Sequence, residues 1–167
     1  MTPSWDLFII LFFVIMTIYG LLLGRGRVFN ILLNSYAGYV IAFEIGAMVY
    51  DKVSTMSSIP QGISVSLFAV KVLLFASVIF ILTLKSELVS SSKDQNANNV
   101  LYTAIYGFLS AGLMTSCIFS FMGEAERMSL FSSSTIAANI YTFRLLWLVA
   151  PIAVVIVTGI LKKIFGK

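Results

Sequence analysis

The sequence contains no histidine and only one cysteine, Cys117, and these absences exclude several kinds of site. A zinc site needs Cys or His ligands, and a Ser/His or Cys/His catalytic pair needs an imidazole base. An internal disulfide needs a second thiol. We also find no paired acids, and no nucleophile with a base, at one depth of a predicted span. We therefore expect no metal site, no cofactor and no enzyme activity.

Charged residues are also few. They make up 11% of the 167 residues, whereas 59% of the residues are hydrophobic and the mean hydropathy is +1.00. A soluble domain carries about 25% charged residues, so this chain is too apolar to fold as a water-soluble globule. The basic residues occur singly or in pairs beside apolar runs, without the basic face of a nucleic-acid-binding protein. We therefore predict an integral membrane protein whose main partner is the lipid bilayer, with no nucleic acid partner.

Five apolar segments are long enough to cross a membrane, because a helix needs about 20 mainly apolar residues to span the hydrocarbon core. The sequence therefore predicts an all-α fold, a polytopic membrane helical bundle with about five transmembrane helices in a single domain. The predicted spans are residues 7–23, 28–50, 62–84, 100–122 and 143–161. The Ser- and Asn-rich stretch 85–99 has no apolar period, so we expect a mobile loop facing solvent there.

Residues 123–142, before the fifth span, contain both polar and apolar residues. Whether they form a helix at the membrane interface stays open. Together with the fifth span they allow one helix from Thr135 to Phe165, which would be about 46 Å long and would exceed the thickness of the hydrocarbon core. The first turns of such a helix are expected at the interface. Pro151 lies in the middle of the fifth span and predicts a kink there.

The lysines and arginines of the predicted loops favour one orientation. The first set is Arg25, Arg27, Lys85, Lys93, Lys162, Lys163 and Lys167, and the second set is Lys52 and Arg127. With the amino terminus outside, the larger set faces the cytoplasm, as the positive-inside rule requires. We therefore predict an external amino terminus and a cytoplasmic carboxy terminus.

Three charged residues lie inside the predicted spans: Glu44, Lys71 and Arg144. An unpaired charge at the bilayer centre costs about 2.5 to 3.5 kcal/mol, so such residues usually face the bundle interior and find a partner. Counted from the outer ends of their spans, Glu44 lies about 9 Å deep and Lys71 about 13 Å deep, within reach on adjacent antiparallel helices. Two interpretations stay open: a buried pair that fixes helix register, or a polar path for protons, ions or a small solute. Arg144 is either part of that path or a residue that reaches lipid phosphates or solvent.

The second span has two faces of distinct composition. Asn30, Asn34 and Glu44 recur at helical spacing on one face, and the two amides are expected to form hydrogen bonds between helices. Small residues repeat every four positions beside them and again on the fourth span, where they let helix backbones approach closely in lipid. These helix-packing residues are Gly38, Ala42 and Gly46, with Gly107 and Ala111. We expect both helices to be central to the bundle and to support association with a second chain.

The first third of the chain carries a further pattern, WDLFIILFFVIMTIYGLLLGRGRVFNILLNSYAGYVIA, over residues 5–42. An Asp precedes the first span, a glycine lies near its end, a Gly/Arg turn follows, and the second span is rich in Leu and small residues. The matching positions are Asp6, Gly20, Gly24, Arg25, Gly26 and Gly38. This pattern resembles the colicin V production protein (CvpA) family of bacterial inner-membrane proteins.

The resemblance implies a small multi-span protein of the bacterial cytoplasmic membrane, connected with colicin V production or export and with envelope integrity. It supplies no catalytic residues, and the family is described with fewer spans than the five predicted here. Our first hypothesis is a non-enzymatic membrane protein that supports envelope assembly or secretion through helix–helix association, as a homo-oligomer or with another membrane protein. The alternative is a channel or transporter subunit in which Glu44 and Lys71 line a polar pathway.

Overall fold

The computed structural model describes residues 4–55, 66–87 and 97–165, and every regular element in these ranges is an α-helix. The helices are α1 (Trp5–Leu23), α2 (Arg25–Thr55), α3 (Leu67–Glu87), α4 (Ala97–Phe121), α5 (Glu124–Ser133), α6 (Thr135–Thr142) and α7 (Arg144–Phe165). Helices α1 to α4 are each long and apolar enough to cross a membrane, and α6 with α7 adds a fifth candidate if this bent pair counts as one span. The predicted all-helical fold is therefore confirmed for the described residues, with four to five candidate spans.

The first four predicted spans correspond to α1, α2, α3 and α4, with differences at their ends. Helix α2 begins and ends outside the predicted range 28–50. The start of the third predicted span, at residue 62, lies outside the described residues, and so does most of the predicted loop 85–99. The described ends of that loop are helical, because α3 continues to Glu87 and α4 begins at Ala97.

The predicted continuous helix from Thr135 to Phe165 is wrong. Its two ends are right, but the chain breaks at Phe143 into α6 and α7, whose axes differ in direction by 61°. Phe143 has backbone angles φ −94° and ψ 23°, outside the α-helical region. The 61° bend lies at Phe143, whereas Pro151, where the sequence predicts a kink, stands inside α7. Neither Gly nor Pro occupies position 143, so the local sequence carries no signal for the break.

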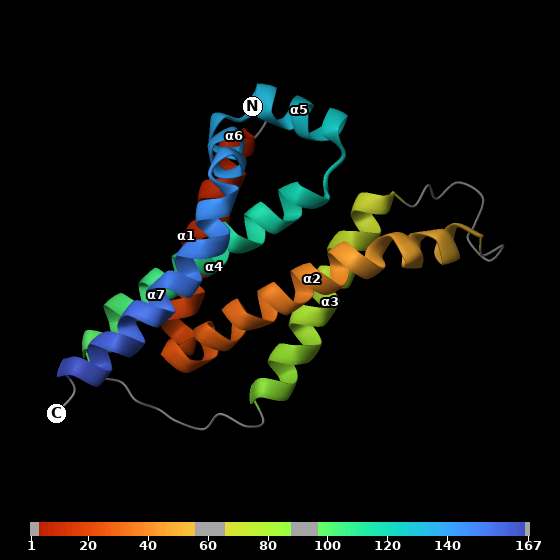
Figure 1. Cartoon of the computed structure of the whole chain (residues 1–167). Helices are drawn as coiled ribbons and strands as arrows, with labels where there is room; N and C mark the ends of the chain where they lie inside the picture. The colour runs from red at the N-terminus through yellow and green to blue at the C-terminus, as the bar shows by residue number, and fades with distance from the viewer. Residues whose placement is uncertain (1–3, 56–65, 88–96, 166–167) are drawn as a thin grey trace.

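Helix α4 is the centre of the fold. In its most apolar window 72% of the residues are buried, against 11% for α1 and 11% for α3. It packs against α1 and α7 on one side and against α2 on the other (Figure 1). Helices α2 and α3 lie side by side as a pair, and α3 makes most of its contacts with α2. The bundle therefore has a covered centre, α4, whereas α1 and α3 are the most exposed of these four candidate spans.

Buried side chains form two groups, one on each side of α4, and α4 contributes to both. The first group lies between α2, α3 and α4 and consists of Val28, Leu32, Ala42, Phe75, Tyr106, Leu113, Cys117 and Phe121. The second lies between α1, α4, α5 and α6 and consists of Ile9, Phe13, Ala111, Phe119, Leu130, Ala137 and Ile140. Because α4 lies between the two groups, its residues are buried around most of its circumference.

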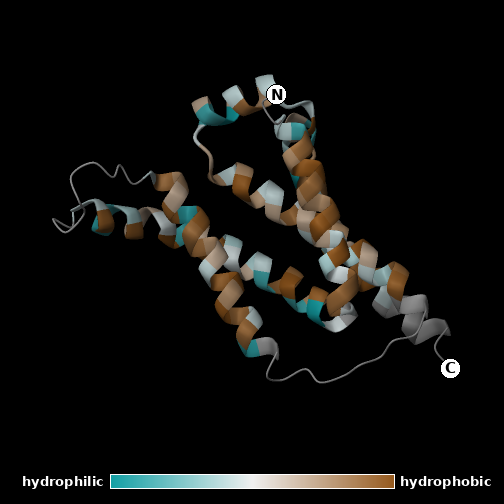
Figure 2. Cartoon of the chain, turned by 180° about the vertical axis from the view of Figure 1, so that it is seen from behind, coloured by the Kyte–Doolittle hydropathy of each residue, from teal (hydrophilic) through white to brown (hydrophobic). Residues whose placement is uncertain are grey.

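The outer faces of the long helices are largely apolar. Leu22 on α1, Met48 on α2 and Leu145 on α7 are 80%, 68% and 70% exposed. Figure 2 shows hydrophobic residues along α1 and α3. A soluble bundle would turn such residues inward and present polar ones to water. The surface is therefore compatible with a multi-pass membrane protein whose outer faces are covered by lipid.

The small residues of α2 pack against α3 within the same chain. A Cβ added at Gly38 would lie 3.2 Å from the Phe75 carbonyl oxygen, and one added at Gly46 would lie 2.6 Å from Cγ of Lys71. Ala42, between these glycines, is fully buried. This stripe is thus the contact surface between α2 and α3, so a second chain would have to bind elsewhere on α2.

The small residues of α4 are also covered, in this case by α1. A Cβ added at Gly107 would lie 3.1 Å from the Met16 carbonyl oxygen, and one added at Gly20 would lie 3.2 Å from Cα of Gly107. Ala111, one turn after Gly107, is fully buried in the second group of core residues. The backbones of α1 and α4 therefore cross closely at two facing glycines, as small residues allow in membrane helices.

Candidate functional site

Glu44 lies on the exposed side of α2, on a face that is otherwise apolar. Val40, Phe43 and Met48 around it are 57%, 49% and 68% exposed, and Ala47 is exposed as well. Within the described residues, Glu44 takes part in no hydrogen bond and no ion pair. We call these five residues of α2 the Glu44 face. Its carboxylate finds no partner in the described part of its own chain.

Lys71 of α3 packs on α2 close to Glu44 in depth but on a different side of the helix. Its Cγ covers Gly46, and its Nζ lies 5.3 Å from the centre of the Phe43 ring, a favourable position for a cation. No ion pair involves Lys71 among the described residues. The buried Glu44–Lys71 pair, one of the two interpretations of these charges, is therefore not formed in the described part of the single chain. Glu44 and Gly46 are two residues apart, about 200° of helical rotation, so a lysine packed on Gly46 lies away from Glu44.

Other polar side chains of α2 do connect it to neighbouring helices. Nδ2 of Asn34 donates a hydrogen bond to Oγ1 of Thr83 on α3, at 3.2 Å. The Tyr36 hydroxyl donates to the Leu148 carbonyl oxygen of α7. Asn30, one turn before Asn34, is half-buried, and its side chain forms no hydrogen bond within the described ranges. Glu44 thus differs from the polar residues that hold α2 in place.

The buried hydroxyls of α4 are mostly satisfied by their own backbone. Ser110 and Thr115 donate to the carbonyl oxygens one turn earlier, each at 2.8 Å. In the part of the chain that the structure describes, Ser116 has the one buried side-chain oxygen without a hydrogen-bond partner. No described carboxylate hydrogen-bonds to any of these three hydroxyls, so they form no acid–base pair for chemistry.

Asp6, at the start of α1, binds the start of α6. Its Oδ1 accepts hydrogen bonds from the Ser134 hydroxyl and from the Ile136 N–H, the latter at 3.2 Å. Ser134 is itself the N-cap of α6, because its Oγ accepts from the Ala137 N–H at 3.0 Å. A carboxylate at a helix N-terminus satisfies free N–H groups and complements the helix dipole. Sequence reasoning missed this contact, for which a Ser before an apolar run was the available signal.

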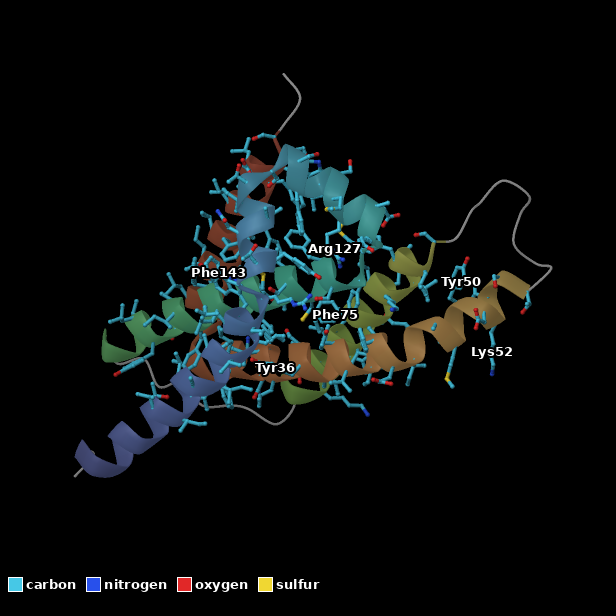
Figure 3. All side chains as sticks on the ribbon, turned by 45° about the horizontal axis from the view of Figure 1, so that its top comes forward. Tyr36, Tyr50, Lys52, Phe75, Arg127 and Phe143 are labelled. Carbon is cyan, nitrogen blue, oxygen red and sulfur yellow. The ribbon has the colours of Figure 1, made fainter. Side chains whose placement is uncertain are left out.

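Arg144 contacts an aromatic ring. Its guanidinium carbon lies 4.8 Å from the centre of the Tyr141 ring, and Nη1 donates a hydrogen bond to the Tyr141 hydroxyl. Arg127 of α5 lies over the same ring, with its guanidinium carbon at 4.6 Å. Figure 3 shows Arg127 below α5. Sequence reasoning did not group these residues, because the two arginines lie in different helices and only the spacing of Tyr141 and Arg144 was a local signal.

Comparisons of the chain with protein-family models, with curated proteins and with solved structures find no match in any of the three. Among the described residues, no group of three or more His, Cys, Asp or Glu side chains is placed to hold a metal ion. Two features of the described residues are unusual: the Glu44 face and the pair of arginines on Tyr141.

Proposed function

We propose that this chain is a non-enzymatic membrane protein that works by associating with a second copy of itself through the Glu44 face. The observation that carries the proposal is a carboxylate without a partner on an exposed, otherwise apolar face of a candidate span. An unpaired charge costs about 2.5 to 3.5 kcal/mol at the centre of a bilayer. A face of this kind therefore favours a protein neighbour with a cation over acyl chains.

The chain carries the required cation at a matching position. Lys71 covers Gly46, two residues from Glu44 along α2, so the two charges lie at nearly the same depth. Counted at about 100° per residue, Phe43 and Ala47 lie on α2 between the side that Lys71 covers and Glu44. The two charges therefore flank one exposed ridge of α2.

Two-fold symmetry makes this arrangement self-complementary. With the axis along the membrane normal and through the ridge, Glu44 of each copy lies opposite Lys71 of the other copy. Both charges then gain a partner, and the apolar ridge side chains pack between the two ion pairs. The charge complementarity supports a second copy as the occupant of the Glu44 face.

Location and role rest on the sequence. The resemblance of residues 5–42 to the CvpA family supports a place in the bacterial cytoplasmic membrane and a part in envelope assembly or secretion. The excess of lysine and arginine on one side supports an external amino terminus. The start of α1 and the far end of α7 lie at opposite ends of the bundle (Figure 1), which supports a cytoplasmic carboxy terminus on the other side of the membrane.

Energy transfer between two tagged forms of the chain in liposomes tests the proposal. Glu44→Gln removes both ion pairs of the dimer, so it should need an about tenfold higher protein-to-lipid ratio for half-maximal transfer. Asp51→Asn makes the same charge change at an exposed site nearer the end of α2 and should behave like the wild type. Equal transfer by Glu44→Gln and Asp51→Asn at every ratio would contradict the proposal.

A second candidate function is a channel or transporter subunit. The common depth of Glu44 and Lys71 favours it, because a path between two copies would pass both charges. A path inside one chain is disfavoured, since Glu44 lies on an exposed face. Proton or ion flux through proteoliposomes that disappears in Glu44→Gln while energy transfer persists would favour this second function over the first.

A further inference from the structure

Two arginines share one tyrosine ring at the point where α6 ends and α7 begins. The guanidinium carbons of Arg127 and Arg144 lie 4.6 Å and 4.8 Å from the centre of the Tyr141 ring. The Tyr141 hydroxyl also accepts a hydrogen bond from Nη1 of Arg144. Three helices therefore bring two permanent positive charges to one small region of the surface, far apart from the Glu44 face in sequence.

These two charges are not neutralised by a carboxylate. Within the described residues neither arginine forms an ion pair, although Glu124 and Glu126 precede Arg127 on α5. Asp6, the one acidic residue of α1, accepts hydrogen bonds from Ser134 and Ile136. An arginine side chain cannot release its proton in a protein, so the mutual repulsion of the pair persists at every ordinary pH. A bound anion would relieve it.

The ring that holds the arginines is itself held by the core. Phe131 of α5 lies 5.2 Å from Tyr141, centre to centre, and Phe119 of α4 lies 6.2 Å from Phe131. The two guanidinium groups are thus presented from a packed base, with Arg127 half-buried and Arg144 exposed. Arginine donors held in this way need less ordering when they bind an oxyanion.

The position of the pair points to a class of ligand. Arg144 is the first residue of α7, where the helix dipole also favours an anion. Phe143 and Leu145, its neighbours in sequence, are 58% and 70% exposed, so apolar surface adjoins the cations at the start of the predicted span 143–161. Arginine binds phosphate, like carboxylate, in a bidentate manner, and an acidic lipid carries phosphate directly above acyl chains.

We propose that Arg127, Tyr141 and Arg144 form a binding site for a phosphate group, carried in the membrane by the headgroup of an acidic lipid. The guanidinium groups bind the phosphate oxygens, and Tyr141 positions them through its ring and its hydroxyl. The apolar side chains beside Arg144 contact the first part of the lipid tails. This site is independent of the Glu44 face and does not require a dimer.

Native mass spectrometry of the full chain in detergent, with phosphatidylglycerol or phosphatidylcholine added, tests this proposal. The wild type should retain phosphatidylglycerol in preference, and Arg127→Gln with Arg144→Gln should lower that retention about tenfold. Lys52→Gln with Lys85→Gln removes the same charge from two exposed sites and should retain the lipid. Arg144→Gln alone changes one exposed residue and should lower phosphatidylglycerol retention by less. This single variant replaces the double variant in the test if the double variant does not fold.

A second arm adds inorganic phosphate in place of lipid and measures the thermal stability of the protein. Stabilisation by millimolar phosphate that is lost in the arginine variants, without a preference for phosphatidylglycerol, would assign the same site to a free phosphate compound. An equal loss of lipid in the arginine and the lysine variants would overturn the site, because general attraction would then explain binding. Unchanged retention in the arginine variants, with no response to phosphate, would overturn it as well.

Discussion

Helices α4 and α3 are both apolar enough to cross a membrane, yet they are placed very differently in the bundle. In α4, 72% of the most apolar window is buried, and its Ser110 and Thr115 hydroxyls bond to its own backbone. In α3, the buried share is 11%, and Lys71 has no carboxylate partner among the described residues. The more polar of the two helices is therefore the buried one. In lipid, burial follows the need of polar groups for protein surroundings and not hydrophobicity alone.

The two helices differ in whether their polar side chains find partners within a single chain. A Ser or Thr in a helix can satisfy its hydroxyl on the carbonyl oxygen one turn earlier, as Ser110 and Thr115 of α4 do. A carboxylate or an ammonium group cannot be satisfied in this way and needs an opposite charge or water. We infer that the side of the bundle built on α1, α4 and α7 packs completely within one chain. The α2–α3 pair gains its missing charge partners from a second copy.

The largest loss of stability is expected from filling the contact between α4 and α7. A Cβ added at Gly112 would lie 2.0 Å from Cε3 of Trp147, so Gly112→Ala forces the indole ring out of its place. Overpacking of this kind costs about 1 to 3 kcal/mol of unfolding free energy. Reaction of a thiol-specific dye with Cys117, which is 1% exposed, would report unfolding during heating.

Gly26→Ala provides the matched control for this change. Nothing lies within 4 Å of a Cβ added at Gly26, which is in the first turn of α2. Alanine is a better helix former than glycine by about 1 kcal/mol, so this variant should be neutral or slightly more stable. Equal melting temperatures for the two variants would show that the α4–α7 contact is looser than described.

A smaller loss is expected from the link between α1 and α6. Asp6→Ala removes an acceptor of two hydrogen bonds at the start of α6 and should cost about 1 kcal/mol, as the loss of a helix cap does. Asp6→Asn keeps an oxygen that accepts from the same donors and should cost less. The same Cys117 assay measures both, and a larger loss for Asn than for Ala would argue against the capping role.

Sequence reasoning predicted the coarse fold, because hydropathy over about 20 residues decides which segments can cross a bilayer. The helical class and four of the spans followed directly, and the ends of the last helical region, Thr135 and Phe165, were also right. The break at Phe143 was not predictable. Position 143 holds neither Gly nor Pro, so no local pattern marks the break.

The candidate sites were predicted less well than the fold. Glu44 and Lys71 were found because a charge in an apolar run stands out, but their relation depends on which side of α2 the partner helix covers. Counting depth along the helix could not supply that rotation. The pair of Arg127 and Arg144 was missed because α5 and α7 meet only after α6 turns back on α1.

Co-purification of two charge-reversed chains from one membrane tests the central claim most directly. One chain carries Glu44→Lys and the other carries Lys71→Glu, each with its own affinity tag. Either variant alone places like charges opposite each other in both contacts of the symmetric dimer, so neither should associate with itself. Mixed together, every contact joins a positive to a negative residue, and the two chains should co-purify as wild-type copies do. Failure of the mixture to associate, with both chains folded, would contradict pairing between copies and remove the basis of the proposed function.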